Sequence, residues 1–550
     1  MAEGGKMADD EPMSVEKQFL LDVHQGELVK RIDLKHTILL DLLKDRGVLL
    51  FSQHEDIQVL PENKKCEEAI KILQKKTDRD FDEFCGALRE TGHGHLVHHY
   101  LSKAAIHKRI SLLQRRLAIY YSNTYKDDMF TYHQEGYRVP LEGLYQPLQW
   151  VEHQRSQKGT TTKPLNSYLD LFKQPGVGRF IVTAEANGGK TTMLRKICRD
   201  WADQHLDGAA GEEHLSKFVV VVPIILRAVK QGASLVDTIR QQLGLTGKDD
   251  LTVKDVKTLI YCLTAKMNDN CFIHDGLDEY NVDKSEEVTA VMSGDLYPSS
   301  WCIITSRPEG ASCVDDWPNV EYREAELKGF SEQSIRKYVE QFFGTSDAAL
   351  GNRLIRTILP EAPVDTEAWS DYVEDTHVGI KQLASNPGRL ALICIIYCEK
   401  EVLPSTKEQL TEEFVKFMLR RWEQKSESKL HEQAPSLAYL DLHKDVLLIF
   451  AELARQTDGG KMKLVFSHKD VKHIDSDMIK VGFLYKSHPV FRLEECEYSF
   501  VHKSIQEYLA AYYLYHCQPD STAAVQAVLR NFWKCVSIWM IASVVIAGST

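Results

Sequence analysis

A loop of small residues near the middle of the chain has the composition needed to bind the phosphates of a nucleotide. Residues 178–192 contain an apolar run typical of a β-strand, then this loop, then the start of an amphipathic helix. In such loops the backbone amides surround the phosphates, a lysine reaches the β- and γ-phosphates, and a threonine hydroxyl binds Mg²⁺. The last two roles fall to Lys190 and Thr191. The candidate nucleotide-contacting residues are Ala184, Glu185, Ala186, Asn187, Gly188, Gly189, Lys190, Thr191 and Thr192.

One residue departs from the usual G-x-x-x-x-G-K-[ST] pattern, because Ala184 stands at the first glycine. If this position needs a positive φ, alanine strains the loop, whereas in an extended conformation alanine is harmless. Gly188 and Gly189 remain at the positions nearest the phosphates. We therefore expect ATP or ADP to bind and hydrolysis to be slow at most.

An acidic segment follows a later apolar run, and it supplies the groups that a nucleotide-bound Mg²⁺ needs. Asp275 ends the run and is the candidate Mg²⁺ ligand together with Thr191. Asp278 and Glu279 are candidate catalytic residues that position or activate the hydrolytic water. An Asp-Gly-x-Asp-Glu turn by itself is more often a solvated loop, but its pairing with the phosphate loop indicates nucleotide binding.

A third apolar run ends at Thr305, and Arg307 follows it. Ligands bind at the carboxyl ends of parallel strands, so the Arg307 guanidinium is a candidate γ-phosphate contact. The alternative is a surface arginine in the turn before Pro308.

The chain as a whole has the composition of a multidomain globular protein. Its 550 residues correspond to about three or four domains, and 43% of them are hydrophobic. The net charge of −12 disfavours a nucleic-acid partner. Twelve cysteines without a C-x-x-C pair indicate reduced thiols and a cytoplasmic location, and no signal peptide is recognisable.

Apolar periodicity divides the chain into helical and mixed regions. Residues 15–102 predict a bundle of six short helices. After residue 178, apolar runs alternate with helices, which predicts a parallel sheet covered on both faces. From about residue 330 the pattern is mostly helical. Between these regions we expect a basic amphipathic helix near residues 108–117, packed on the next domain rather than on a membrane or calmodulin, and a polar loop at 154–163.

Two further segments have alternative interpretations. His93, His95, His98 and His99 form a cluster with some potential for Zn²⁺, but no thiolate or carboxylate nearby completes a site, so a solvated turn is favoured. Residues 535–550 are uncharged but fall short of the roughly 20 residues that span a bilayer. We expect a buried segment of a further, truncated helical domain there, and no stable membrane insertion.

The helical N-terminal region resembles the caspase-recruitment domain (CARD) of the death-fold superfamily. The resemblance lies in residues 39–43, 47–50 and 55–57, in Leu73, and in the apolar spacing of residues 81–88. A death-effector domain, another death-fold module or an unrelated six-helix bundle remain alternatives.

From about Gln149 to the C-terminus, the chain resembles the NACHT domain of the STAND P-loop ATPases, as used by NOD-like receptors (NLRs). The matching segments are residues 184–192, 275–279, 305–308, 327–331, 386–390 and 500–509. The resemblance implies that Pro387 lines the adenine pocket in a helical domain. It also implies that His502, in a winged-helix domain, contacts the β-phosphate of ADP and holds a closed state. No leucine-rich repeat is visible in these residues.

The predicted fold is therefore multidomain: an all-α death-fold bundle, an α/β P-loop nucleotide-binding domain, a helical domain and a winged-helix domain. The expected segments are 1–14 disordered, 15–105 CARD-like, 106–165 linker, 166–328 NACHT, 329–400 helical, 401–515 winged-helix and 516–550 the start of a further helical domain.

The predicted function is that of a nucleotide-gated signalling receptor or adaptor, closed with ADP and open with ATP and Mg²⁺. It would self-associate into a ring and recruit a CARD adaptor or caspase in innate immunity or apoptosis, with slow STAND-type ATPase activity at most and no nucleic-acid partner. The alternative is a non-switching death-fold scaffold or inhibitor with an inactive or nucleotide-locked NACHT module.

Overall fold

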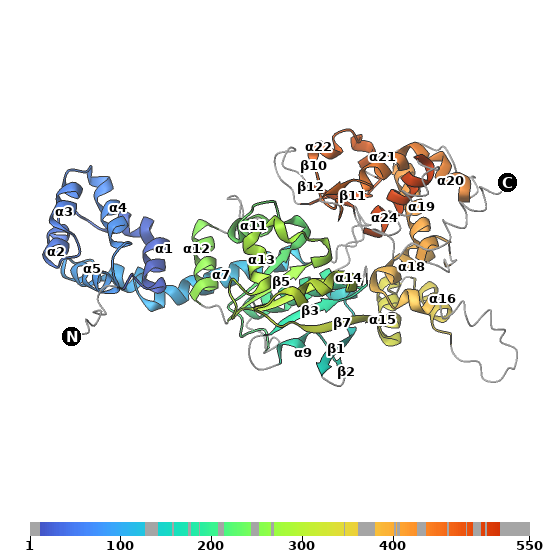
Figure 1. The fold of residues 1–550 in the computed structure, drawn as a ribbon, viewed down its shortest axis with the longest axis horizontal. Helices are drawn as coiled ribbons and strands as arrows, with labels where there is room; N and C mark the ends of the chain where they lie inside the picture. Colours follow the sequence, from blue (N-terminus) through green and yellow to red (C-terminus); the bar gives the residue numbers. More distant parts are fainter. Residues whose placement is uncertain are drawn as a thin grey trace.

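The molecule consists of an N-terminal group of helices, a central β-sheet flanked by helices, and a C-terminal group of helices with small sheets (Figure 1). The computed structural model describes residues 11–126, 141–156, 159–173, 178–185, 188–206, 214–243, 252–265, 269–345, 347–360, 380–400, 403, 407–425, 436–458, 461–479, 481–487, 497–500 and 503–517.

Six helices form the N-terminal bundle, as the apolar periodicity predicts. They are α1 (Val15–Arg31), α2 (Leu39–Asp45), α3 (Phe51–Gln58), α4 (Glu62–Leu73), α5 (Asp78–Glu90) and α6 (Gly94–Tyr100). Leu21, Leu28 and Leu96 are among the fully buried residues of its core. Helix α5 begins where the Thr77 hydroxyl accepts from the Asp80 amide and the Asp80 carboxylate accepts from the Thr77 amide. The death-fold assignment of this bundle stays a prediction.

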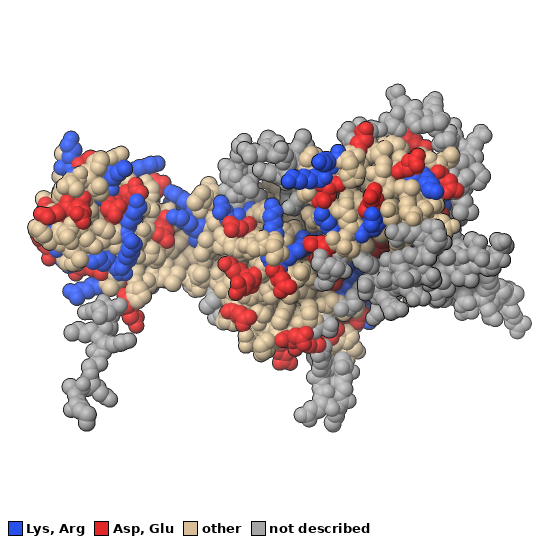
Figure 2. Space-filling view, turned by 45° about the horizontal axis from the view of Figure 1, so that its top comes forward, with Lys and Arg blue, Asp and Glu red and all other residues tan. Residues whose placement is uncertain are grey.

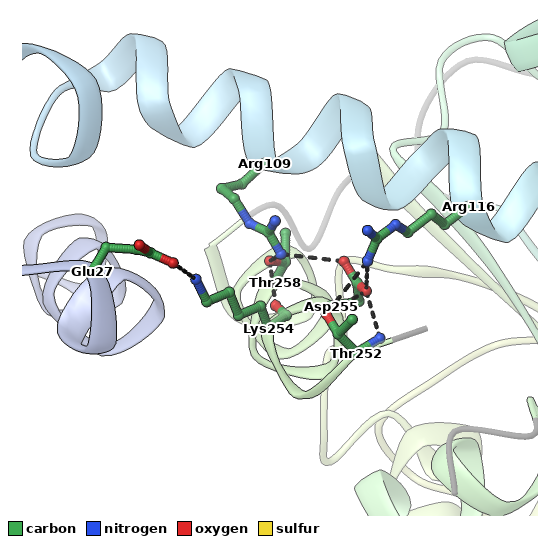
Figure 3. Close-up of polar contacts among 7 residues, drawn as sticks. All are labelled: Glu27, Arg109, Arg116, Thr252, Lys254, Asp255 and Thr258. Atoms are coloured by element: carbon green, nitrogen blue, oxygen red, sulfur yellow. Dashed lines mark hydrogen bonds and ion pairs between the residues drawn. The ribbon is translucent and has the colours of Figure 1, made fainter. Parts of the chain in front are cut away.

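Helix α7 (Lys103–Thr124) continues from the bundle and lies along the central domain, so the predicted packing of this basic helix is confirmed. Its Arg109 and Arg116 both pair with Asp255 of α12 (Val253–Ala265), a carboxylate that is 1% exposed (Figure 3). Further along α7, the Tyr121 hydroxyl donates to the Val221 carbonyl at 2.6 Å. The helix therefore connects the bundle to the sheet.

Helix α1 also contacts α12 directly. The rings of Phe19 and Tyr261 stack with their centroids 4.2 Å apart. Lys254 Nζ lies 2.9 Å from Glu27 Oε1, and Figure 3 shows the two side chains pointing toward each other. The bundle is thus docked on the central domain through α1 as well as through α7.

The central sheet has the strand order β2-β1-β7-β3-β6-β5-β4. Strands β7, β3, β6, β5 and β4 run parallel, which confirms the predicted parallel sheet. Pro223 lies in β4, an edge strand, where a missing backbone donor is tolerated. The strands are β1 (Leu148–Ser156), β2 (Gly159–Leu165), β3 (Arg179–Thr183), β4 (Val220–Ile225), β5 (Asn270–Asp275), β6 (Trp301–Ser306) and β7 (Arg323–Phe330).

The predicted polar loop at 154–163 is wrong, because strands β1 and β2 form an antiparallel hairpin there. Strand β1 also pairs with β7 and so adds the hairpin to the sheet. Threonine has high β-propensity, and a polar strand is well suited to a sheet edge, which explains how residues 160–162 form a strand despite their polarity. Around the sheet lie α8 (Leu141–Leu144), α9 (Leu169–Phe172), α10 (Lys190–Leu206), α11 (Leu235–Gln242), α13 (Glu286–Ser293) and α14 (Pro308–Ala311).

Helices continue beyond the sheet, as predicted from about residue 330: α15 (Glu332–Phe343), α16 (Ala348–Ile358), α18 (Pro387–Lys400) and α19 (Lys407–Lys425). In α18, Cys394 is buried, whereas Cys398 is exposed. The cysteines of the described residues form no disulfide bonds, and the predicted reduced state stays a prediction.

The C-terminal module, residues 436–517, combines helices with two small sheets. Strand β12 (Glu497–Phe500) lies between β10 (Phe466–Ser467) and β11 (Leu484–Ser487), and β8 (Thr457–Asp458) pairs with β9 (Lys461–Met462). The module's helices are α20 (Ser436–Leu442), α21 (Lys444–Ala454), α22 (His468–Val471), α23 (Ser476–Ile479) and α24 (Lys503–Cys517). Its winged-helix assignment stays a prediction.

None of the described helices is long and apolar enough to cross a lipid bilayer. The apolar segment 535–550 and residues 1–10 lie outside the described residues. On the face drawn in Figure 2, basic and acidic side chains are interspersed over the N-terminal helices and over the C-terminal elements. This mixed pattern differs from the basic stripe that nucleic-acid-binding surfaces present.

Candidate functional site

The phosphate loop, residues 184–189, joins the central strand β3 to helix α10. Strand β3 is buried along its whole length, so the loop emerges from the carboxyl edge of the sheet. Helix α10 begins at Lys190, which directs its N-terminal amides toward the loop, as anion-binding helices do. The Lys190 ammonium donates to the carbonyls of Ala184 at 2.8 Å and Glu185 at 2.9 Å. Burial lowers the pKa of Lys190, while the negative charge of Asp278 opposes that shift. Thr192 lies in the first turn of α10, and Ala186 and Asn187 lie outside the described residues.

Ala184 is compatible with the loop. Tyr297 is the one non-glycine residue with a positive φ in the described part of the chain, so Ala184 does not adopt the left-handed conformation that favours glycine. Its side chain is buried and fills space beside Gly188. A Cβ on residue 188 would lie 2.9 Å from the Ala184 Cβ and 3.0 Å from the Glu185 carbonyl oxygen. Alanine at 184 therefore makes glycine at 188 sterically necessary.

Thr191 and Asp275 come together across the site, as a shared Mg²⁺ role requires. The Thr191 hydroxyl donates to Asp275 Oδ2 at 2.6 Å, and the Thr305 hydroxyl donates to Asp275 Oδ1 at 2.6 Å. Asp275 ends β5 and is 8% exposed. A carboxylate beside a hydroxyl is an oxygen donor set that fits Mg²⁺, which keeps several waters and few protein ligands.

Asp278 and Glu279 are both held by cations. Asp278 Oδ1 accepts from the Arg307 amide at 3.1 Å, and Asp278 Oδ2 lies 3.3 Å from Arg307 Nε and 3.5 Å from Lys503 Nζ. Glu279 Oε2 lies 3.8 Å from Arg227 Nη1. Both carboxylates lie at the carboxyl edge of the sheet beside the phosphate loop. Their catalytic roles stay a prediction.

Arg307 lies at the end of β6, as predicted, and its guanidinium is engaged by two carboxylates. Besides Asp278, its Nη1 lies 3.4 Å from Glu507 Oε1 of α24. The C-terminal module therefore reaches the same edge of the sheet as the phosphate loop. His502, the residue expected to bring that module to the nucleotide, lies outside the described residues.

Pro387 lies next to the phosphate loop. A Cβ built on Gly189 would be 3.8 Å from Pro387 Cγ. Asn386 caps α18 by accepting from the Arg389 amide at 3.2 Å, and a proline at the first helical position suits this geometry. Arg389 also pairs with Glu185 of the loop at 2.9 Å. The adenine-binding role of Pro387 stays a prediction.

A close backbone contact holds Ser385, just before α18, against the end of β7. Gly329, at the end of β7, has φ of 97°, and a Cβ there would lie 2.4 Å from the Ser385 carbonyl oxygen. The Phe330 amide donates to the same carbonyl at 2.6 Å. Because the Ser385 carbonyl lies so close, residue 329 has no room for a side chain, which explains the glycine at this position of the 327–331 segment.

The histidine cluster near residue 95 does not form a metal site among the described residues, which contain no group of three or more suitable side chains. His93 is buried, and its Nε2 accepts from the Asp33 amide at 3.1 Å. The favoured solvated turn therefore fits His95, His98 and His99, which are exposed, but not His93.

The sequence did not reveal Lys503, Glu507, Arg227 or Arg389 as site residues. Only the spacing of Lys503 and Glu507, one helical turn apart at the end of the 500–509 segment, offered a signal. Their partners lie in segments that follow strands distant in the sequence, which local patterns do not identify.

Comparison with known proteins agrees with this geometry. A model of the NACHT domain family matches residues 179–346, which extend from β3 past α15. Protein NLRC5 of Mus musculus is 26% identical over 393 residues, which are 67% of this chain. The chain therefore contains a NACHT domain and is similar to an NLR protein. It spans only 18% of the length of the curated relative that it matches.

Solved structures offer weaker likenesses to this NACHT protein. The Aeropyrum pernix ORC2 protein, in ADPNP–ADP complexes, is 11% identical with a TM-score of 0.24, covering 63% of this chain and 89% of that chain. Drosophila ORC bound to DNA is 12% identical with a TM-score of 0.21, covering 60% and 88%. TM-scores this low do not establish a shared overall fold.

Proposed function

We propose that this chain is a nucleotide-gated signalling receptor or adaptor, closed with ADP and open with ATP. One observation carries the proposal: α24 of the C-terminal module pairs with Arg307 and Asp278, beside the phosphate loop. A change in the ligand at that loop then acts on a contact between modules. Ligands shift a conformational equilibrium only through such differences in contact.

Nucleotide and Mg²⁺ would be held by groups that already converge on the carboxyl edge of the sheet. The loop amides and Lys190 suit the phosphates, while Thr191 and Asp275 suit Mg²⁺. The γ-phosphate supplies the charge that distinguishes ATP from ADP. Asp278 and Glu279 would position water for slow hydrolysis.

In the open state, the NACHT modules would self-associate and bring their N-terminal bundles together. Bundles of the CARD type would then recruit a death-fold adaptor or caspase in the cytoplasm, in innate immunity or apoptosis. The NACHT match, the similarity to an NLR protein and the helical N-terminal region support this part of the proposal.

The test is the nucleotide content of the purified full chain. Lys190→Ala removes the ammonium that the phosphates need, and we expect it to abolish retained ADP. Lys173→Ala, which removes a half-exposed lysine paired with Asp170, is the matched control. Equal ADP content in the two variants would overturn the nucleotide-site assignment.

A second candidate function is a non-switching scaffold or inhibitor with a nucleotide-locked NACHT module. The buried ion pairs between α24 and the sheet favour it, because they stabilise one arrangement of the modules. The two candidate functions predict different masses in solution. A nucleotide-locked chain keeps the same mass with ADP and with an ATP analogue, whereas a nucleotide-gated chain forms a larger species with the analogue.

A further inference from the structure

Helix α24 presents two opposite charges to the nucleotide site. Lys503 and Glu507 are four residues apart, so they share one face of the helix. Lys503 Nζ lies 3.5 Å from Asp278 Oδ2, and Glu507 Oε1 lies 3.4 Å from Arg307 Nη1. Arg307 Nε and Asp278 Oδ2 are themselves 3.3 Å apart. The four side chains thus form an alternating chain of charges, here called the α24 cluster.

The α24 cluster is largely removed from water. The exposed fractions of its side chains are 7% for Asp278, 10% for Glu507, 11% for Arg307 and 22% for Lys503. Two acids and two bases give a formal charge of zero. A buried ion pair tolerates desolvation only while both partners are present, so losing one partner is costly.

The position of Arg307 makes it a shared partner. It follows β6, the strand between β3, which leads into the phosphate loop, and β5, which ends at Asp275. Its backbone amide is fixed by Asp278 at 3.1 Å. A γ-phosphate in this site would seek the same guanidinium, because arginine pairs strongly with phosphate oxygens.

The Glu507 carboxylate and a γ-phosphate would compete for the Arg307 guanidinium. If the γ-phosphate takes Arg307, the Glu507 carboxylate loses its base while remaining buried beside added negative charge. Movement of α24 away from the sheet would return Glu507 to water. ADP lacks the third phosphate and leaves the Arg307–Glu507 contact intact.

We propose that Glu507 discriminates between nucleotides: its carboxylate occupies Arg307 in the closed arrangement and disfavours a γ-phosphate there. Lys503 pairs with Asp278 at the other end of the cluster and so keeps α24 positioned with Glu507 beside Arg307. The inference rests on the proposed nucleotide-gated function and assigns its discriminating contact to a side chain of the C-terminal module.

The test compares affinities for MgADP and for a Mg²⁺-bound non-hydrolysable ATP analogue in the full chain. Glu507→Gln removes the charge and preserves the shape, so binding of the analogue should tighten relative to ADP by on the order of tenfold. Glu507→Asp keeps the charge but shortens the side chain, and we expect a smaller shift in the same direction. Glu452→Gln, at an exposed acid of α21 paired with Arg455, is the matched control and should leave the ratio unchanged.

The outcomes separate this inference from the function on which it rests. If Glu507→Gln leaves the affinity ratio unchanged while Lys190→Ala abolishes binding of both nucleotides, the discriminating role of Glu507 is refuted and the nucleotide site stands. If Glu507→Gln tightens both nucleotides equally, Glu507 acts on the whole site, and the inference is also refuted. If Lys190→Ala binds both nucleotides normally, the proposed function itself fails. Thermal unfolding of each variant checks that it is folded.

Discussion

Neutralising Asp255 should loosen the attachment of the N-terminal bundle to the NACHT domain. Asp255 Oδ1 lies 3.2 Å from Arg109 Nη2, and its Oδ2 pairs with Arg116 Nη1 (Figure 3). Oδ2 also accepts from the Thr252 amide at 2.6 Å, at the start of α12. Asp255→Asn keeps the size of the side chain and removes the charge that both arginines need.

The magnitude follows from burial. Removing one partner of a buried ion pair costs ~3–5 kcal/mol, and the Arg109 side chain is 11% exposed. Arg116 is 29% exposed, so water screens its loss and its contribution is small. We therefore expect Asp255→Asn to lower the free energy of local opening by about 3 kcal/mol, the lower end of that range. This corresponds to about a hundredfold change in the opening equilibrium.

Hydrogen exchange of the full chain measures this opening. Amides of α12 and the adjacent part of α7 should exchange about a hundredfold faster in Asp255→Asn if exchange follows the opening equilibrium. Asp237→Asn is the matched control, because Asp237 bonds Ser234 at the start of α11 in a similar way but is exposed. Equal acceleration in the two variants, each in its own helix, would refute the role given to the buried arginine pairs.

Two further predictions concern packing and pH. Gly188→Ala should weaken ADP binding, because its Cβ would lie 2.9 Å from that of Ala184, and adding Ala184→Gly should restore part of the affinity measured by calorimetry; no recovery would contradict the steric explanation. Burial, with the nearby charges of Arg109 and Lys254, lowers the pKa of His24 from 6.5 to about 4. A histidine with a lowered folded-state pKa contributes stability that is present above its unfolded value and is lost as the pH falls from about 6.5 toward 4. Thermal melting of the N-terminal bundle should therefore fall over that range, and His24→Gln should reduce the dependence; an unchanged pH profile would contradict this account.

Local patterns in the sequence predicted those parts of the fold that depend on local periodicity. The apolar runs of β3, β5 and β6 predicted buried parallel strands, and the N-terminal helices follow their apolar spacing. Threonines 160–162 form a strand only because β1 provides a partner, whereas their polarity suggested a loop.

The site followed the same division. Lys190 and Thr191 were identified from the phosphate-loop pattern, and Asp275 and Arg307 because each ends or follows an apolar run. The backbone conformation at Ala184 could not be read from residue type, and only the structure shows that it is not left-handed. Glu507 is 200 residues from Arg307 in sequence, and only the folded chain brings the two together.

The central claim is that the nucleotide sets the assembly state of the chain. Its most direct test is the solution mass of the purified full chain, measured with MgADP and then with a Mg²⁺-bound non-hydrolysable ATP analogue. The account predicts the mass of a single chain with ADP and a larger species with the analogue. The same mass with both nucleotides, each shown to be bound, would contradict nucleotide gating.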